Sequence, residues 1–334
     1  MAKEKVLIIK LGYSETLDNG VSNSSSLGDV LRTTVLLHLY KKAEVKWLVD
    51  EAAAPLLVGN PHIHQILPYN MTSVLQLQTE HFDTVINLEK VPGICALADS
   101  INAWRRFGFR FHSQSGKVMS YDGSHQVLTI CSNIKLKRQN GKYWQEALFE
   151  IVEQKWNGEK YVLGYRPHSK VVHDIGLNHK VGSKWPTKAW PITKWKSLHD
   201  TLTKKGYSVS WQQGLNDLYE YMEWINSCRT IVTNDSLGLH IAQALGKKVV
   251  ALYGPTVATE VYMYGQGKAL TPDCQCEHMP CLSPSCKEKT PCMEFITVES
   301  VAFALEEIAT SRRSVQVNLS ESGSRVSRAN QVAI

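Results

Sequence analysis

The sequence lacks the features of a membrane-spanning or secreted chain. Across 334 residues, no apolar run approaches the roughly 18 to 20 residues that a spanning helix needs. The N-terminal apolar stretch is short and has no small-residue cleavage site, so we interpret it as a first β-strand and not as a signal peptide. There is also no basic run and no recognised nucleic-acid motif, so we expect no nucleic-acid partner.

The charge balance is only mildly basic. The net charge is +6 and the pI about 8.8, while 43% hydrophobic and 20% charged residues are ordinary values for a globular protein. A weak positive bias suits anionic small molecules or a membrane surface, and it is equally compatible with a slightly basic soluble protein. We therefore expect a cytoplasmic protein whose contact with a membrane, if any, is peripheral.

Short apolar runs alternate with helix-periodic segments, in two halves. Two doubly wound α/β domains are the architecture that this rhythm favours. We place an N-terminal domain at residues 1–160, a C-terminal domain at 161–310 and a disordered polar tail at 311–334. The expected strands are Val6–Leu11, Val45–Val49, Thr84–Leu88, Val171–Gly176, Ser208–Trp211, Thr230–Val232 and Val249–Tyr253, with helices at Val30–Tyr40, Ile192–Leu202 and Val298–Ile308.

The first candidate motif is TNDSLGLHIAQALGKKVVALYGPT, residues 233–256. A strand ends at Asn234-Asp235, a Ser and a Gly open a helix that carries His240, and a second strand ends in Tyr-Gly-Pro-Thr. The N-terminus of a helix at the carboxyl edge of a parallel sheet is a site for phosphate. A routine βαβ unit, with Asp235 or Ser236 as the helix cap, explains the same pattern.

The second motif is GLNHKVGSKWPTKAWPITKW, residues 176–195. It follows a strand and contains Ser183, Lys184, Lys188 and two Trp-Pro pairs. Lysines beside a backbone turn suit a diphosphate, because their fixed positive charge can neutralise a leaving nucleotide. A tryptophan-rich packing loop with solvated lysines is the alternative.

Together with SLGDVLRTT near the start, these motifs resemble glycosyltransferase family nine, the ADP-heptose:lipopolysaccharide heptosyltransferases. The resemblance covers nearly the whole chain to about residue 310. It implies the GT-B architecture, in which two Rossmann-like domains face each other across a cleft. The C-terminal domain holds the nucleotide-sugar, the N-terminal domain faces the acceptor, and the anomeric centre is inverted without a catalytic metal.

Asp29 occupies the Gly-Asp position of that family. The resemblance implies that it is the general base, which takes a proton from the acceptor hydroxyl. A carboxylate at a helix N-terminus is stabilised in its charged form, which weakens it as a base. The leaving diphosphate does much of the work, so a well-positioned base of modest strength can suffice. A helix-capping role is compatible with the catalytic one.

The resemblance also implies a set of donor-binding residues. Lys188 matches the lysine of Lys-x-Trp-Pro, and Ser183 a phosphate-binding hydroxyl. In the family's Asp-Ser/Thr-Gly-x-x-His pattern the usual Gly is Leu237 here, and the Gly follows one position later. The acidic residue for the donor sugar is open among Asp217, Glu220 and Glu223, and the long segment Gly12–Ser25 is expected to form a lid over the cleft. The predicted donor-binding set is Ser183, Lys184, Lys188, Asp235, Ser236, Gly238, His240 and Thr256.

Five of the eight cysteines crowd into one stretch, at Cys274, Cys276, Cys281, Cys286 and Cys292. Their spacing is not a clean CxxC…CxxC. Four of the five thiolates can hold a structural zinc or iron, because such a site folds a loop without a core of its own. Iron is a candidate beside zinc because autotransporter-protein heptosyltransferases, relatives of this family, bear iron. Reduced cysteines are the second interpretation and a disulfide the third.

The resemblance implies an inverting enzyme that transfers a heptose from ADP-heptose to a saccharide or lipid-linked acceptor in lipopolysaccharide or surface-glycan synthesis. A protein acceptor and a different nucleotide-sugar are the alternatives. A nucleotide-sugar epimerase would share the fold but need no acceptor. A metal-bearing scaffold without turnover is the non-enzymatic alternative. The sequence does not define the oligomeric state.

Overall fold

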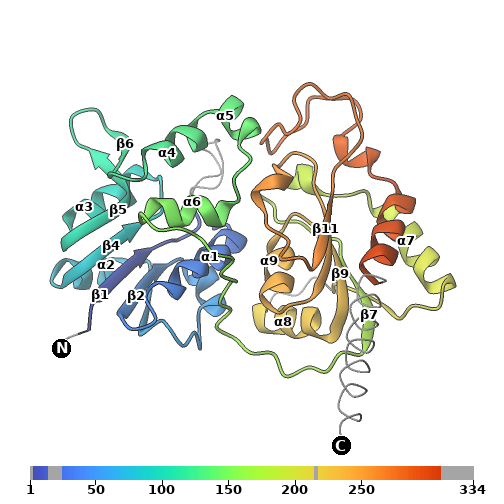
Figure 1. Cartoon of the computed structure of the whole chain (residues 1–334), viewed down its shortest axis with the longest axis horizontal. Helices are drawn as coiled ribbons and strands as arrows, with labels where there is room; N and C mark the ends of the chain where they lie inside the picture. The colour runs from blue at the N-terminus through green and yellow to red at the C-terminus, as the bar shows by residue number, and fades with distance from the viewer. Residues whose placement is uncertain (1–2, 14–24, 214–216, 310–334) are drawn as a thin grey trace, which may run out of the picture.

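The computed structural model describes residues 3–13, 25–213 and 217–309. The chain forms two α/β lobes side by side, with the N-terminal lobe on the left of Figure 1 and the C-terminal lobe on the right. The predicted tail at 311–334 and most of the predicted lid at Gly12–Ser25 lie outside the described residues.

The N-terminal lobe contains a six-stranded sheet with the order β3-β2-β1-β4-β5-β6. Its strands are parallel except for β6, which runs antiparallel to β5. The order reverses between β1 and β4, which makes this the topological switch point of the sheet. The strands are β1 (Lys5–Ile9), β2 (Glu44–Val49), β3 (Gln65–Pro68), β4 (His81–Asn87), β5 (Asn102–His112) and β6 (Lys117–Ser120).

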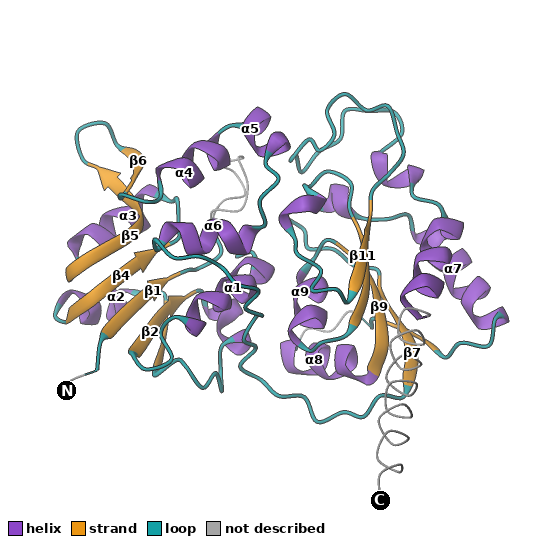
Figure 2. Cartoon of the chain, in the orientation of Figure 1, coloured by secondary structure: helices purple, strands orange, loops and turns teal. Residues whose placement is uncertain are grey.

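Helices cover both faces of this sheet (Figure 2). The expected helix at Val30–Tyr40 begins earlier than predicted and tightens after about two turns into a 3₁₀ helix. The helical elements are α1 (Leu27–Thr33), η2 (Thr34–His38), η3 (Glu51–Leu56), α2 (Met71–Gln78), α3 (Pro92–Ser100), α4 (His125–Ser132), α5 (Ile134–Gln139) and α6 (Trp144–Ile151).

The C-terminal lobe contains a five-stranded parallel sheet with the order β11-β10-β9-β7-β8. Its switch point lies between β7 and β9. The elements are β7 (His173–Asn178), η4 (Pro186–Lys188), α7 (Ile192–Lys204), β8 (Val209–Trp211), α8 (Leu218–Ser227), β9 (Cys228–Asn234), α9 (Leu237–Ala244), β10 (Lys248–Leu252), η5 (Ala258–Glu260), β11 (Gly267–Leu270) and η6 (Cys292–Phe295). The expected last helix is present at residues 298–309.

The central strands are fully buried because both faces of a parallel sheet are covered by helices. In β1, Val6, Leu7, Ile8 and Ile9 have no exposed surface. Alternate residues therefore pack into the two different cores that flank the sheet. This is why the strand sequence is a continuous apolar run and not an alternating one.

The tryptophan of one Trp-Pro pair in the second motif packs into the core of the C-terminal lobe. Trp190 is buried beside Trp195, with the two rings 5.0 Å apart, and its indole N–H donates to the Ile296 carbonyl. Trp185, from the first pair, is only partly buried and lies elsewhere. The packing interpretation therefore holds for Trp190.

The two lobes meet along α1 and α9 (Figure 1). Leu31 and Leu56 of the N-terminal lobe are buried in the same apolar cluster as Leu239 and Tyr221 of the C-terminal lobe. The connecting chain is anchored on the first lobe, where the Val162 N–H donates to the Thr34 hydroxyl at 2.8 Å. Within the described residues, no helix is both long enough and apolar enough to span a bilayer.

Candidate active site

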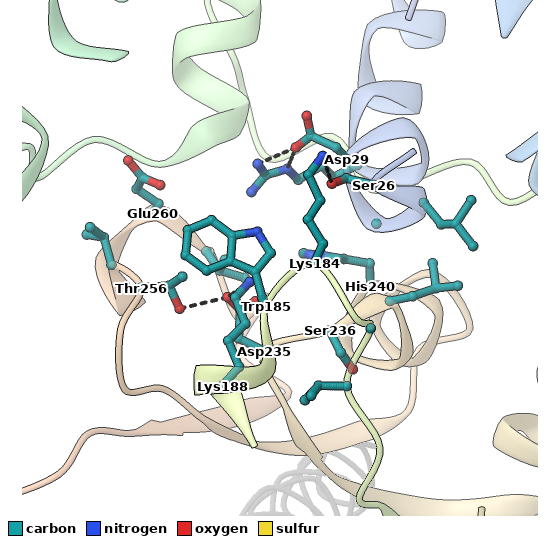
Figure 3. Close-up of a pocket in the computed structure, with 18 of the residues that line it drawn as sticks. Ser26, Asp29, Lys184, Trp185, Lys188, Asp235, Ser236, His240, Thr256 and Glu260 are labelled. Atoms are coloured by element: carbon teal, nitrogen blue, oxygen red, sulfur yellow. Dashed lines mark hydrogen bonds and ion pairs between the residues drawn. The ribbon is translucent and has the colours of Figure 1, made fainter. Parts of the chain in front are cut away.

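A cavity of about 280 Å³ opens between the lobes, at the carboxyl ends of strands from both sheets. Asp29 follows β1 and Lys90 follows β4, so the two residues come from both sides of the first switch point. Lys184 and Trp185 follow β7, and Asp235 follows β9, at the second switch point. Ligands of open α/β sheets bind at such points. Figure 3 shows the side chains of Asp29, Lys184 and Asp235 converging from the two lobes.

Asp29 lies in the first turn of α1 and is 3% exposed. Its Oδ1 accepts from Arg32 Nε at 2.6 Å, and Lys10 Nζ lies 2.8 Å from its Oδ2. Burial alone would raise the pKa of Asp29, but the charges of Arg32 and Lys10 hold it well below its usual range. The N-cap of α1 is Ser26, so the Asp29 carboxylate is an ion-paired group and not the helix cap.

Lys188 and Asp235 form an ion pair on the opposite wall. Lys188 Nζ lies 2.8 Å from Asp235 Oδ2, which also accepts from the Thr256 hydroxyl at 2.8 Å. Burial would raise the pKa of Asp235, but the charge of Lys188 and these hydrogen bonds lower it to about 2. Lys188 also lies 5.0 Å from the centre of the Trp185 ring. These contacts fix the Lys188 ammonium at the edge of the cavity.

Lys184 reaches from the C-terminal lobe to the N-terminal lobe. It is 8% exposed, and its Nζ donates to the Ser26 hydroxyl at 3.1 Å. Burial lowers the pKa of Lys184 to about 8, although the nearby Asp29 carboxylate opposes this shift. A second lysine thus faces the cavity at the N-cap of the helix that carries Asp29.

His240 and Ser236 belong to the N-terminal part of α9. The Ser236 hydroxyl accepts from the Asn178 amide at 3.1 Å, and the backbone of Ser236 forms the N-cap. Burial, together with the positive charge of Arg32, lowers the pKa of His240 to about 4, so its imidazole is neutral at pH 7. Both residues line the cavity, where the positive end of the α9 dipole favours an anion.

The structure brings most of the predicted site residues together. Asp29, Lys184, Lys188, Asp235, Ser236, His240 and Thr256 all line the cavity. Ser183 is exposed and does not line it. Gly238 does not line it either. A Cβ at Gly238 would lie 2.3 Å from the Tyr221 hydroxyl, so the shifted glycine allows α9 to pack closely against that side chain.

None of the three acidic residues considered for the donor sugar lines the cavity. Asp217 caps α8 by accepting from the Tyr219 N–H at 2.6 Å. Glu223 accepts from the Tyr165 hydroxyl at 2.6 Å and so holds the chain between the lobes. The acidic side chain of the C-terminal lobe that lines the cavity, besides Asp235, is Glu260.

Sequence reasoning missed several charged residues of the site. Lys10, Arg32, Glu89, Lys90, Lys137 and Glu260 lie in or directly behind the cavity. Lys137 of α5 lies 3.8 Å from Glu260, so this pair links the two lobes. The only available signal was position, since Lys10 lies near the end of the predicted strand Val6–Leu11 and Glu89 follows the predicted strand Thr84–Leu88.

The cysteine-rich loop borders the cavity. Leu282 lines it, and Arg138 of the N-terminal lobe donates to the carbonyls of His278 and Pro280. Burial and the charges of the four other loop cysteines raise the pKa of Cys292 to about 11. All eight thiols are free, and no group of three or more His, Cys, Asp or Glu side chains in the described part of the chain is arranged to hold a metal. The zinc or iron site predicted for this loop stays a prediction.

Comparison with known proteins agrees with this arrangement. The sequence profile of glycosyltransferase family 9 (heptosyltransferase) matches residues 213–291, which include α9 and the strand ends around Asp235 and Thr256. Lipopolysaccharide heptosyltransferase 1 of Pseudomonas aeruginosa is 21% identical over 330 residues, which cover 79% of this chain and 85% of that protein. The chain is thus similar to glycosyltransferase family 9, through its matched C-terminal segment and its heptosyltransferase relatives. It is therefore a glycosyltransferase enzyme.

Solved structures of bacterial glycosyltransferases show the same fold. Escherichia coli heptosyltransferase WaaC with ADP superposes with a TM-score of 0.61 at 14% identity, covering 91% of this chain and 99% of that one. The iron-containing dodecameric glycosyltransferase TibC of enterotoxigenic E. coli gives a TM-score of 0.57 at 13% identity, covering 92% and 77%. The GT-B architecture, with two Rossmann-like lobes around a cavity, is thereby confirmed.

Proposed function

We propose that this glycosyltransferase is an inverting heptosyltransferase, which transfers a heptose from ADP-heptose to a sugar acceptor in lipopolysaccharide or surface-glycan assembly. The observation that carries the proposal is the shared cavity. The Asp29 carboxylate from one lobe faces the Lys188–Asp235 pair from the other. The Pseudomonas relative is a lipopolysaccharide heptosyltransferase, and the WaaC structure contains ADP.

The donor diphosphate would lie on the C-terminal wall. The N-terminus of α9 at Ser236 and the Lys188 ammonium both favour an anion there. Lys184 lies within reach of the same space from the side of Ser26. These fixed positive groups would stabilise the charge that develops on the diphosphate as it leaves. Thr256 and Glu260 also line the cavity and would contact the nucleoside end, where Glu260 can accept hydrogen bonds from hydroxyl groups.

The acceptor would enter from the N-terminal lobe. Its hydroxyl oxygen attacks the anomeric carbon and forms the new C–O bond, while the bond from that carbon to the diphosphate breaks and its electron pair leaves with ADP. Asp29 receives the hydroxyl proton. A carboxylate of low pKa is a weak base. It accepts the proton best when the new bond to the anomeric carbon is partly formed, because the hydroxyl is then more acidic. Attack from the side opposite the leaving group inverts the anomeric centre.

Three cations on the acceptor side of the cavity, Arg32, Lys90 and Lys137, suit an acceptor that carries negative charge. A lipid-linked saccharide would bring the enzyme to the cytoplasmic face of the inner membrane by peripheral contact. A protein acceptor is the second candidate. TibC, an iron-containing heptosyltransferase, has a similar fold, and the donor side of the cavity would be the same for either kind of acceptor.

Parallel calorimetric titrations with ADP-heptose, UDP-glucose and UDP-N-acetylglucosamine test the donor. We expect selective binding of ADP-heptose, and at least tenfold weaker binding to Lys188→Met. Lys46→Met is the matched control, because Lys46 pairs with Glu80 on the N-terminal lobe away from the cavity. Preference for a UDP-sugar would overturn the heptosyl assignment, and binding to none of the three would favour a scaffold without turnover.

A further inference from the structure

A lysine lies behind Asp29. Lys10, one residue after β1, is 3% exposed. Its Nζ lies 2.8 Å from Asp29 Oδ2 and 3.3 Å from Glu89 Oε1. Lysine is almost never fully buried unless it is paired. Here the ammonium sits between two carboxylates from different segments, so it connects the ends of β1 and β4 with α1.

Glu89 orients this lysine and is itself held by the backbone. It follows β4, has no exposed surface, and its Oε1 accepts from the Leu11 N–H at 2.8 Å and the Gly12 N–H at 2.6 Å. A buried carboxylate with two backbone donors has little freedom to move. The position of the Lys10 ammonium is therefore set by the turn that follows β1, independently of any ligand.

The two cations on Asp29 differ in their access to the cavity. Arg32 lines the main cavity together with Asp29, and it contacts Oδ1. Lys10 does not line that cavity. It lines a separate pocket of about 20 Å³ behind Asp29, together with Trp144 and Leu148. An acceptor can thus reach the Arg32 side of the carboxylate, while the Lys10 side stays enclosed by protein.

We propose that Lys10 is the positioning residue for the catalytic carboxylate, anchoring Asp29 Oδ2 from behind so that Oδ1 stays directed at the acceptor hydroxyl. Arg32 then is the exchangeable partner, which shares Oδ1 with the incoming hydroxyl. This inference rests on the proposed transferase function, in which the hydroxyl proton passes to Asp29. Lys10 touches no substrate and acts only through Asp29.

The proposal has a consequence for the pH dependence. The charged and titratable groups that face Asp29 are Lys10, Arg32, Lys184, His240 and Tyr161. Of these, Arg32 and Lys10 lower the pKa of Asp29 against the effect of burial. Loss of the Lys10 charge leaves burial less opposed, so the pKa of Asp29 rises. Asp29 would then become protonated, and inactive as a base, at a pH where the wild type is still active.

The experiment compares the pH profile of kcat, at saturating donor, for the wild type, Lys10→Met and the control Lys46→Met. Lys10→Met should move the acid limb of the kcat profile up by at least one pH unit, so that kcat falls more at acid pH than at pH 8. Binding of ADP should stay within twofold, because Lys10 does not line the main cavity. Lys46→Met should keep the wild-type profile.

A second variant tests whether misfolding explains the effect of Lys10→Met. Lys10→Met removes a positive charge that pairs with the buried Glu89 carboxylate. Lys10→Met combined with Glu89→Gln removes both buried charges and keeps a side-chain oxygen that can accept from the Leu11 and Gly12 amides. This double variant should show the same shift of the acid limb. An equal loss of kcat at every pH, or an unchanged profile, would overturn the proposal.

Failure of the donor assignment would look different, because the wild type itself would then transfer no heptose. In that case, carboxyl NMR of Asp29 in the free enzyme still tests Lys10, since the Asp29 resonance should titrate at higher pH in Lys10→Met than in the wild type. An identical titration in both proteins would contradict the role of Lys10.

Discussion

Gly28 on α1 lies directly against His240 on α9, across the boundary between the lobes. A Cβ built on Gly28 would lie 2.7 Å from His240 Cδ2, closer than real Cβ contacts. The glycine before Asp29 therefore allows the acceptor-side helix to approach the donor-side helix. The same contact sets the distance between the Asp29 carboxylate and the donor wall.

Gly28→Ala should separate these helices. Alanine is the better helix former by about 1 kcal/mol, so a propensity effect alone would stabilise the protein. The steric conflict should reverse the sign, with a destabilisation of about 1–3 kcal/mol and a loss of kcat/KM of at least tenfold. Thermal unfolding and steady-state kinetics measure both. Gly93→Ala in α3 is the control, because nothing lies within 4 Å of its Cβ position. Equal behaviour of the two variants would contradict this account.

Lys188→Met should weaken ADP binding by about 1.5–3 kcal/mol, the usual contribution of a hydrogen bond to a charged group. It also leaves the Asp235 carboxylate without its 2.8 Å partner. Lys188→Arg keeps the charge and should retain most of the affinity, although its planar head does not reproduce the geometry. Calorimetry with ADP tests both variants. Wild-type affinity in Lys188→Met would remove Lys188 from the donor site.

His240 should make stability depend on pH between about 4 and 6.5. Its pKa is about 4 in the folded protein and has the ordinary value of 6.5 in the unfolded chain, which therefore binds more protons in this window. The stabilisation is present above pH 6.5 and lost as the pH falls to about 4, by at most roughly 3 kcal/mol. Urea unfolding at pH 5 and 7.5 measures it. His240→Gln should flatten the difference, and an unchanged pH dependence would mean that other groups cause it.

The metal predicted for the cysteine-rich loop has a direct test. Four thiolates of the five would hold about one zinc or iron per chain. Elemental analysis of protein purified without chelator should find that metal, and Cys276→Ser combined with Cys281→Ser should lose it while ADP binding persists. Five loop thiols that react freely in native protein, with no bound metal, would favour the reduced cysteines of the structure.

Part of the fold could be predicted from local patterns. Val6–Leu11 and Thr84–Leu88 are short apolar runs that a parallel sheet buries on both faces, and both form strands within a few residues of the prediction. In contrast, β5 was missed because NAWRRFGFRFH mixes arginines with aromatics, and only its middle residues are buried. The strand β3 was missed because it is short and ends in Pro68.

Only some of the site residues could be recognised from the sequence. Lys188 and Asp235 could be recognised because each lies within a compact motif, although their ion pair joins two motifs that are far apart in the chain. Lys10 and Glu89 are 79 positions apart and meet only because β1 pairs with β4. Such a pair has no local signature. Glu260 was missed for the same reason, since its partner Lys137 belongs to the other lobe.

The most direct test of the central claim is a transfer assay. The enzyme is incubated with ADP-heptose and heptose-deficient lipopolysaccharide, and the acceptor product and released ADP are both quantified. We predict one heptosyl group transferred per ADP released, with inverted anomeric configuration, and loss of transfer but not of ADP binding in Asp29→Asn. Release of ADP with free heptose alone, or transfer that persists in Asp29→Asn, would contradict the account.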